Sequence, residues 1–189
     1  FVMAINRKDF IKKACLTGVC TCGLAPVLLG GQGDTSVSSE DQDSANPNAL
    51  QQEWIAVLLG NMDSTISESK MRELLKPCAL THYNSIGMDK ITGAHAGDMD
   101  GFVSYLRSDW DWKADYDREA GIIVCDENKD HCVCPMVNRA KNNGSDAMCY
   151  CSEGFIEKMF SAVAGRPVRA TVDKSILRGD KSCCYIVHL

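Results

Sequence analysis

The residues best suited to chemistry are two C-x-C units, Cys132-Val133-Cys134 and Cys149-Tyr150-Cys151, which a polar loop separates. Four thiolates are what a tetrahedral zinc ion or an iron–sulfur cluster requires. Alternate side chains of a regular strand lie about 6.6 Å apart on one face, so both sulfurs of a unit reach one ion only where the backbone bends. Pro135 offers a place for that bend. The pattern therefore predicts a zinc site, with an iron–sulfur cluster as the alternative cofactor.

Cys78 and His82 lie four residues apart, which on a helix places both on one face, toward the core. Both are candidates to complete or replace metal ligands, although a lone His82 is more often a core histidine. Two other interpretations of the cysteines stay open: disulfides, and reduced thiols packed as small apolar side chains. Cys125 is expected in the core, and Cys183-Cys184 would place one thiol on each face of a strand.

The elements that must position these residues predict an α+β fold that begins with helices. Apolar residues recur at helical spacing over 54–62 and 71–78, Ser67 is placed to cap the second helix, and Pro77 should kink it. A further short helix is expected over 99–107.

From Trp112 the apolar period changes to two, which indicates strands. A hairpin is expected from 112–116 and 122–125, and a strand over 131–137 would extend it to a three-stranded antiparallel meander. A helix over 153–164 follows, with Gly165 as its left-handed end. A last hairpin, 168–176 against 183–189, turns around Gly179-Asp180.

The N-terminal segment, residues 1–32, resembles a twin-arginine export signal. The matching positions are Arg7, Phe10, Ile11 and Lys12, with Lys8 where the second arginine usually stands. The apolar run over 14–29 is too short to span a bilayer, so no transmembrane span is expected. The signal predicts a protein that is exported to the periplasm or tethered to the membrane by an uncleaved leader. The alternative is a cytoplasmic protein with an amphipathic N-terminal helix.

Residues 33–50 contain almost no large apolar side chains and are expected to form a disordered spacer, which leaves 51–189 as a single domain. The net charge of −5 and the absence of a basic stripe argue against nucleic acid as a partner. No G-x-S-x-G elbow, P-loop, dinucleotide fingerprint or H-E-x-x-H helix is present, so the common enzyme motifs give no support.

The run C-Y-C-S-E-G-F-I-E-K-M-F-S-A-V-A-G-R-P-V and the later S-I-L-R-G-D-K-S-C-C-Y-I-V resemble the C-terminal half of the 4-vinyl reductase domain family. The C-V-C-P segment and the region of Cys78 resemble its relatives grouped with L-2-amino-thiazoline-4-carboxylate hydrolase. The resemblance implies an α+β ligand-binding fold that is often dimeric, which allows a homodimer. Some members hold zinc through cysteines and a glutamate. Here Cys149 or Cys151 and Cys183 match such ligands, whereas Ser175 and Val172 replace the others.

Three functions follow as expectations, of which the third is a redox protein that carries a cysteine-bound iron–sulfur cluster. The first is a metal-stapled module that binds a small molecule in an apolar cavity lined by Phe155, Met159 and Phe160. The second, implied by the resemblance, is a hydrolase that opens a small heterocycle with water, with Glu153 as the candidate proton carrier. A glutamate in the first turn of a helix also stabilises the helix dipole, which would explain Glu153 without chemistry.

Overall fold

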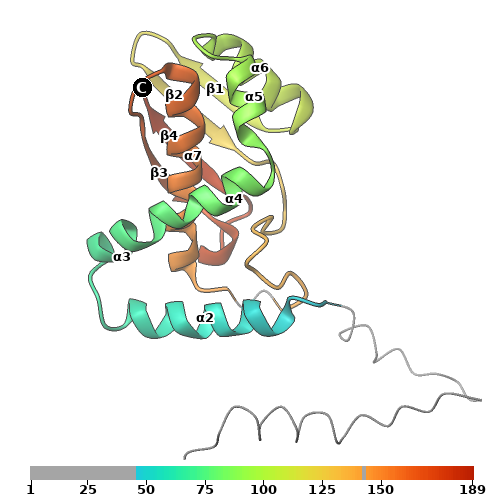
Figure 1. Cartoon of the computed structure of the whole chain (residues 1–189), viewed down its shortest axis with the longest axis vertical. Helices are drawn as coiled ribbons and strands as arrows, with labels where there is room; N and C mark the ends of the chain where they lie inside the picture. The colour runs from blue at the N-terminus through green and yellow to red at the C-terminus, as the bar shows by residue number, and fades with distance from the viewer. Residues whose placement is uncertain (1–45, 142–143) are drawn as a thin grey trace, which may run out of the picture. The chain divides into compact units, whose positions relative to one another are not determined.

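The computed structural model describes residues 46–141 and 144–189, so the expected export signal and most of the spacer lie outside the described residues. The described chain forms a helical layer against a four-stranded antiparallel sheet, as Figure 1 shows. The expected α+β class is confirmed. No helix in these two ranges is both long enough and apolar enough to cross a membrane.

The N-terminal part is helical, as expected. Its elements are α2 (Ala49–Asp63), α3 (Glu68–Leu75), the short 3-10 helix η2 (Lys76–Cys78), α4 (Ala79–Ser85), α5 (Met88–Ala94) and α6 (Met99–Asp109). The Ser67 side chain accepts a hydrogen bond from the Lys70 amide and so caps α3. Pro77 lies in η2, where the α-helical pattern is interrupted before it restarts in α4.

The sheet has the order β1-β2-β4-β3, with every neighbouring pair antiparallel. Its strands are β1 (Lys113–Asp117), β2 (Ile122–Asp126), β3 (Arg169–Lys174) and β4 (Cys184–His188). Both expected hairpin pairings are present. Inward-facing residues such as Ile123, Ala170 and Val187 are buried beneath the helices, whereas Val124 is 40 % exposed on the other face.

The expected three-stranded meander is wrong in its third strand, because residues 131–137 form no strand. Pro135 has no amide hydrogen for a ladder, and the Val137 amide bonds back to the Cys134 carbonyl at 3.1 Å, which closes a local turn. The place beside β2 is taken by β4, whose His188 pairs with Ile122.

The long helix α7 (Cys149–Ala164) crosses the helical face of the sheet and packs against β3 and β4 (Figure 1). It begins at Cys149 and not at Glu153, because the 3-10 turn η3 (Asp146–Met148) leads directly into it. The Ser145 hydroxyl caps that turn by accepting from the Ala147 amide. Gly165 ends α7 in a left-handed conformation with φ 65°, as expected.

Candidate functional site

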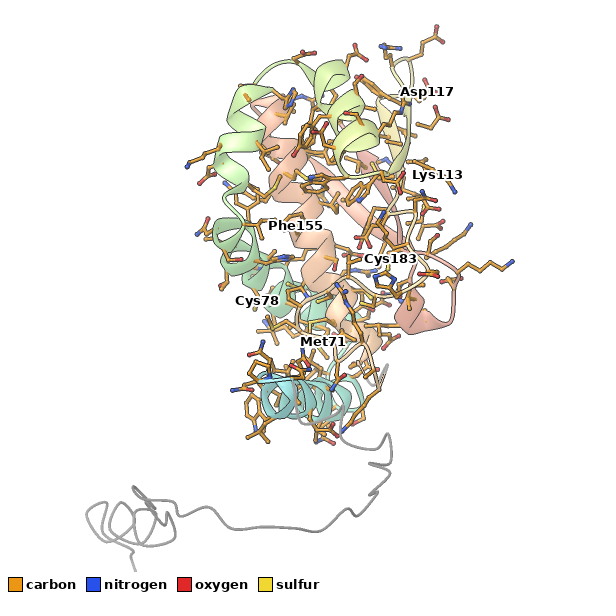
Figure 2. The ribbon with its side chains drawn as sticks, turned by 90° about the vertical axis from the view of Figure 1, so that its right-hand side faces the viewer. Met71, Cys78, Lys113, Asp117, Phe155 and Cys183 are labelled. Atoms are coloured by element: carbon orange, nitrogen blue, oxygen red, sulfur yellow. The ribbon has the colours of Figure 1, made fainter. Side chains whose placement is uncertain are left out.

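Cysteines from three distant segments meet at one end of the domain. Cys132 and Cys134 lie in the loop after β2, and Cys149 and Cys151 lie in the first turn of α7. Cys183 immediately precedes β4 and is labelled in Figure 2. Around them, Leu59 of α2, Val137 and Met148 form an apolar cluster with Cys132, against which Cys134 and Cys151 pack. The loop and the helix start thus bring the two C-x-C units together.

The other three thiols of the C-x-C units lie near Cys134. Burial raises the pKa of Cys134 to about 12, and the neighbouring Cys132, Cys151 and Cys149 raise it further because a thiolate here would face three other sulfurs. The pKa of Cys183 is also raised to about 12, first by burial and then by Glu127, Cys132 and Cys149. At neutral pH these are buried, protonated thiols.

Cys149 has a polar partner that the sequence did not indicate. Its thiol donates to the Ser175 hydroxyl at 3.3 Å, and Ser175 is completely buried. The same hydroxyl accepts the Arg178 amide at 3.2 Å, which starts the short 3-10 helix η4 (Ile176–Arg178). Ser175 therefore connects the start of α7 to the segment between β3 and β4.

Glu127 is the main site residue that sequence reasoning missed, since it sits in the polar run D-E-N-K-D that predicts only a turn. Its side chain is buried, and it accepts a hydrogen bond from the Tyr185 hydroxyl at 3.1 Å. Burial raises the pKa of the Glu127 carboxyl to about 7, while bonds from Tyr185 and Cys183 act in the opposite direction. A buried carboxyl thus adjoins the thiols.

Cys78 and His82 do not both face the core as expected. Cys78 is exposed and donates weakly to the Leu74 carbonyl at 3.6 Å, because it stands at the end of η2 and not within a long helix. It is near enough to Cys151 to contribute, after burial, to that thiol's pKa of about 11. His82 stacks on Phe155 with ring centroids 5.0 Å apart, and burial lowers the pKa of its imidazole.

Glu153 lies in the second turn of α7 and is completely buried, so its expected position in the first turn is wrong. Its carboxylate accepts from Arg72 Nε at 3.0 Å and from the Val172 amide at 3.0 Å, and Lys76 Nζ lies 3.4 Å away. These contacts tie α3 and β3 to α7. They give Glu153 a structural role, while the predicted proton transfer stays a prediction.

The expected cavity residues are packed in the main core. Phe155 is 9 % exposed, and Met159 and Phe160 are fully buried among side chains of α4, α6 and the sheet. Elsewhere, a cavity of about 200 Å³ lies beside the thiols and has Cys132 in its lining. The other lining residues are Asp130, His131, Arg139 and Ile176.

The donors present are chemically suited to a soft metal ion, since thiolates are zinc ligands and the other three thiols of the C-x-C units are close enough to Cys134 to raise its pKa. Across residues 46–141 and 144–189, however, no three His, Cys, Asp or Glu side chains are already arranged as ligands. Alternate residues of a helix face different directions, so Cys149 and Cys151 would have to turn their side chains to share an ion. The cysteines in these ranges are free thiols.

Together, the fold and the site define a two-layer α+β domain with a buried thiol cluster at one end. The chain belongs to the family of unknown function DUF6144, whose model matches residues 34–189. No curated protein matches the sequence. Among solved structures, the chain is similar to a trafficking protein particle complex subunit 3 from Naegleria fowleri, covalently bound to palmitic acid. The identity is 12 %, the match covers 74 % of this chain and 93 % of that one, and the TM-score is 0.46.

Proposed function

We propose that this domain binds a metal ion, zinc, through the thiols of its two C-x-C units. The observation that carries the proposal is the packing of the two C-x-C units against each other, since Cys134 and Cys151 both pack on the cluster that contains Cys132. The raised pKa of Cys134, to which Cys132, Cys151 and Cys149 contribute after burial, agrees with this packing. These cysteines come from a loop and from the start of a helix, so nothing local requires them to meet. A zinc ion bound by these thiols would cross-link the loop to the start of α7.

Metal binding would also explain the local chemistry. The thiols of Cys132 and Cys149 are buried and those of Cys134 and Cys151 are half-buried. Without a cation their ionisation is disfavoured, as the raised pKa of Cys134 indicates. A bound divalent cation stabilises the thiolates and offsets that cost. A packed core has no need for five polarisable, oxidisable sulfurs in one place, since alanine or valine would fill the same space without redox chemistry.

The cavity beside Cys132 favours the binding-module form of the proposal. It is lined by Asp130, His131 and Arg139, so it offers charged groups of both signs to a small polar ligand. The hydrolase alternative has less support, because the carboxylate of Glu153 is held in ion pairs with Arg72 and Lys76.

The test is the metal content of the full chain, purified without oxygen, alongside two single-cysteine variants. We expect about one zinc per chain in the unaltered protein, and much less in Cys134→Ser. Cys125→Ser is the matched control, since Cys125 is a buried thiol of the main core that lies outside the C-x-C cluster. It should keep its metal.

The visible spectrum of the same samples separates zinc from an iron–sulfur cluster, because only the cluster is coloured. Two results would overturn the proposal. One is an unaltered chain that contains no metal as purified and takes up none when zinc is added. The other is a Cys134→Ser variant that binds as much zinc as the control.

A further inference from the structure

Helix α2 exposes a continuous apolar stripe. Its members are Leu50, Trp54, Val57 and Leu58, whose exposed fractions are 78 %, 63 %, 58 % and 40 %. Their spacing of four, three and one residues places all four on one face of the helix. Asn61 continues the same face and is also exposed. A tryptophan and three branched aliphatic side chains in one row form a patch of the kind that marks an interaction site.

The opposite face of α2 holds the helix to its own domain. Gln52 and Leu59 are buried there, Ile55 and Met62 pack against the cluster that contains Leu59, and the Gln52 amide donates to the Pro135 carbonyl at 2.9 Å. In Figures 1 and 2, α2 lies along one end of the domain, away from the sheet. Helices of this length are marginal in water unless an apolar face is packed. Helix α2 therefore has two apolar faces, one packed on the domain and one, the stripe, turned outward.

The charge on α2 indicates what covers the stripe. The helix contains no lysine or arginine, and its acidic residues, Glu53 and Asp63, are outside the stripe. Helices that bind anionic membrane surfaces carry many lysine and arginine residues on their polar face, and α2 has none. A second copy of the chain meets no like charge along this face. The uncharged stripe therefore fits itself better than it fits a membrane.

Shape leads to the same partner. When two copies of α2 pack antiparallel about a two-fold axis centred between Ile55 and Ala56, Trp54 of each copy faces Val57 of the other. The largest side chain of the stripe thus meets its smallest apolar one. Gly60 lies on the flank, where an added β-carbon would touch nothing within 4 Å, so packing within the chain does not require a glycine there. A glycine in a helix is destabilising, and close approach of another helix would account for it.

We infer that the α2 stripe is the interface of a homodimer in which two α2 helices pack antiparallel. If each of the four side chains buries on the order of 100 Å², each copy contributes about 400 Å². That is roughly half of the area per partner in a standard stable interface. The dimer is therefore expected to exchange with monomer, with a dissociation constant in the micromolar range. This inference does not depend on metal binding.

The test uses sedimentation equilibrium of the full chain between about 1 and 300 μM. The unaltered chain should shift from monomer to dimer across this range. Trp54→Lys and Val57→Glu should each weaken dimerisation at least tenfold, since each would bury an unpaired charge. Ile86→Lys is the control, because Ile86 is a similarly exposed apolar residue, 47 % exposed, that lies outside α2. A melting temperature equal to that of the unaltered chain would show that each variant folds.

Mixing the two α2 variants tests whether Trp54 of one copy faces Val57 of the other. A heterodimer of Trp54→Lys and Val57→Glu chains sets the new lysine against the new glutamate and keeps one native Trp54–Val57 contact. The mixture should therefore dimerise more tightly than either variant alone. Three outcomes would overturn the inference: a monomer at every concentration, dimers that both variants leave intact, or co-sedimentation with phosphatidylcholine vesicles that Trp54→Lys abolishes in a chain that stays monomeric.

Discussion

Arg72 and Glu153, 81 residues apart in the chain, form a two-point ion pair. Arg72 Nε lies 3.0 Å from one carboxylate oxygen and Nη2 lies 3.3 Å from the other. The carboxylate is completely buried, whereas a third of the arginine side chain is exposed. Glu68 holds the same guanidinium at 2.6 Å from the preceding turn of α3. The pair therefore fixes α3 against the middle of the domain.

Replacing Glu153 with alanine should destabilise the fold by about 1–3 kcal/mol, because it leaves the buried Val172 amide without its acceptor and removes one of the carboxylates that pair with Arg72 and Lys76. The two cations keep Glu68 and Glu157 as partners. Urea unfolding followed by circular dichroism measures the change. Glu73→Ala is the control: Glu73 is 68 % exposed and forms a surface ion pair with Lys70, so its loss should cost less than about 1 kcal/mol. Equal losses in the two variants would contradict a structural role for Glu153.

Gly154→Ala should also destabilise the domain, through steric overlap. A β-carbon at this position would lie 2.3 Å from the Lys76 carbonyl oxygen, where α7 crosses η2 with its backbone in close contact. Either the two elements separate or the ion pairs around Lys76 shift, and both lower the melting temperature. In Gly93→Ala the new methyl meets nothing within 4 Å, so that variant should melt at the same temperature or slightly higher. A Gly154→Ala protein as stable as Gly93→Ala would show that the crossing is loose.

The Glu127 carboxyl predicts a pH dependence of stability. Its pKa is about 7 in the folded chain against an ordinary value of 4.5, so the folded state binds the extra proton between these values. Its contribution is fully present below pH 4.5 and is lost as the pH rises to about 7, an effect on the order of 3 kcal/mol.

Urea unfolding of Glu127→Gln and of the unaltered chain, compared from pH 4.5 to 8, checks this. The stability of the variant relative to the unaltered chain should rise over that window and then level off. The exposed residue Glu119 provides the control, and Glu119→Gln should follow the unaltered chain throughout. A constant difference between Glu127→Gln and the unaltered chain would contradict the assignment.

The hydroxyls of Tyr83 and Thr92 are buried and lie 2.8 Å apart, and Thr92 in turn donates to the Met88 carbonyl. Thr92→Val should cost about 1–3 kcal/mol, since it leaves the Tyr83 hydroxyl without its acceptor. Adding Tyr83→Phe removes that stranded hydroxyl. The double variant should therefore be more stable than the sum of the single effects predicts, and strictly additive effects in the cycle would exclude the coupling.

The parts of the fold that the sequence predicted are those determined locally. The Ser67 cap, the Gly165 helix end and the two hairpins depend on residues close in the chain, and all are present. Long-range order was not predictable in the same way. Nothing near residue 122 indicates that its partner is His188. The pattern around Pro135 predicts a strand, because composition does not show the local turn that forms there.

The thiol cluster was predicted from spacing, but with the wrong local structure. Cys149 and Cys151 lie in a helix and not in an extended segment, and the loop carries Cys132 and Cys134 to them. Glu127 gave no signal, because a carboxylate in a polar run is usually exposed and only tertiary packing buries it. The apolar residues of α2 predicted the helix correctly. They could not show that the domain buries the opposite face.

The central place of β4 in the sheet has a consequence for how the protein is made. β4 separates β2 from β3, yet it is the last of the four strands to be synthesised. While the ribosome still holds residues 184–188, the β1–β2 hairpin and α7 can form, but β2 and β3 each present an open edge that another nascent chain could pair with. The domain can close only after translation has passed these residues, so its exposure to chaperones and to aggregation should be concentrated in that interval.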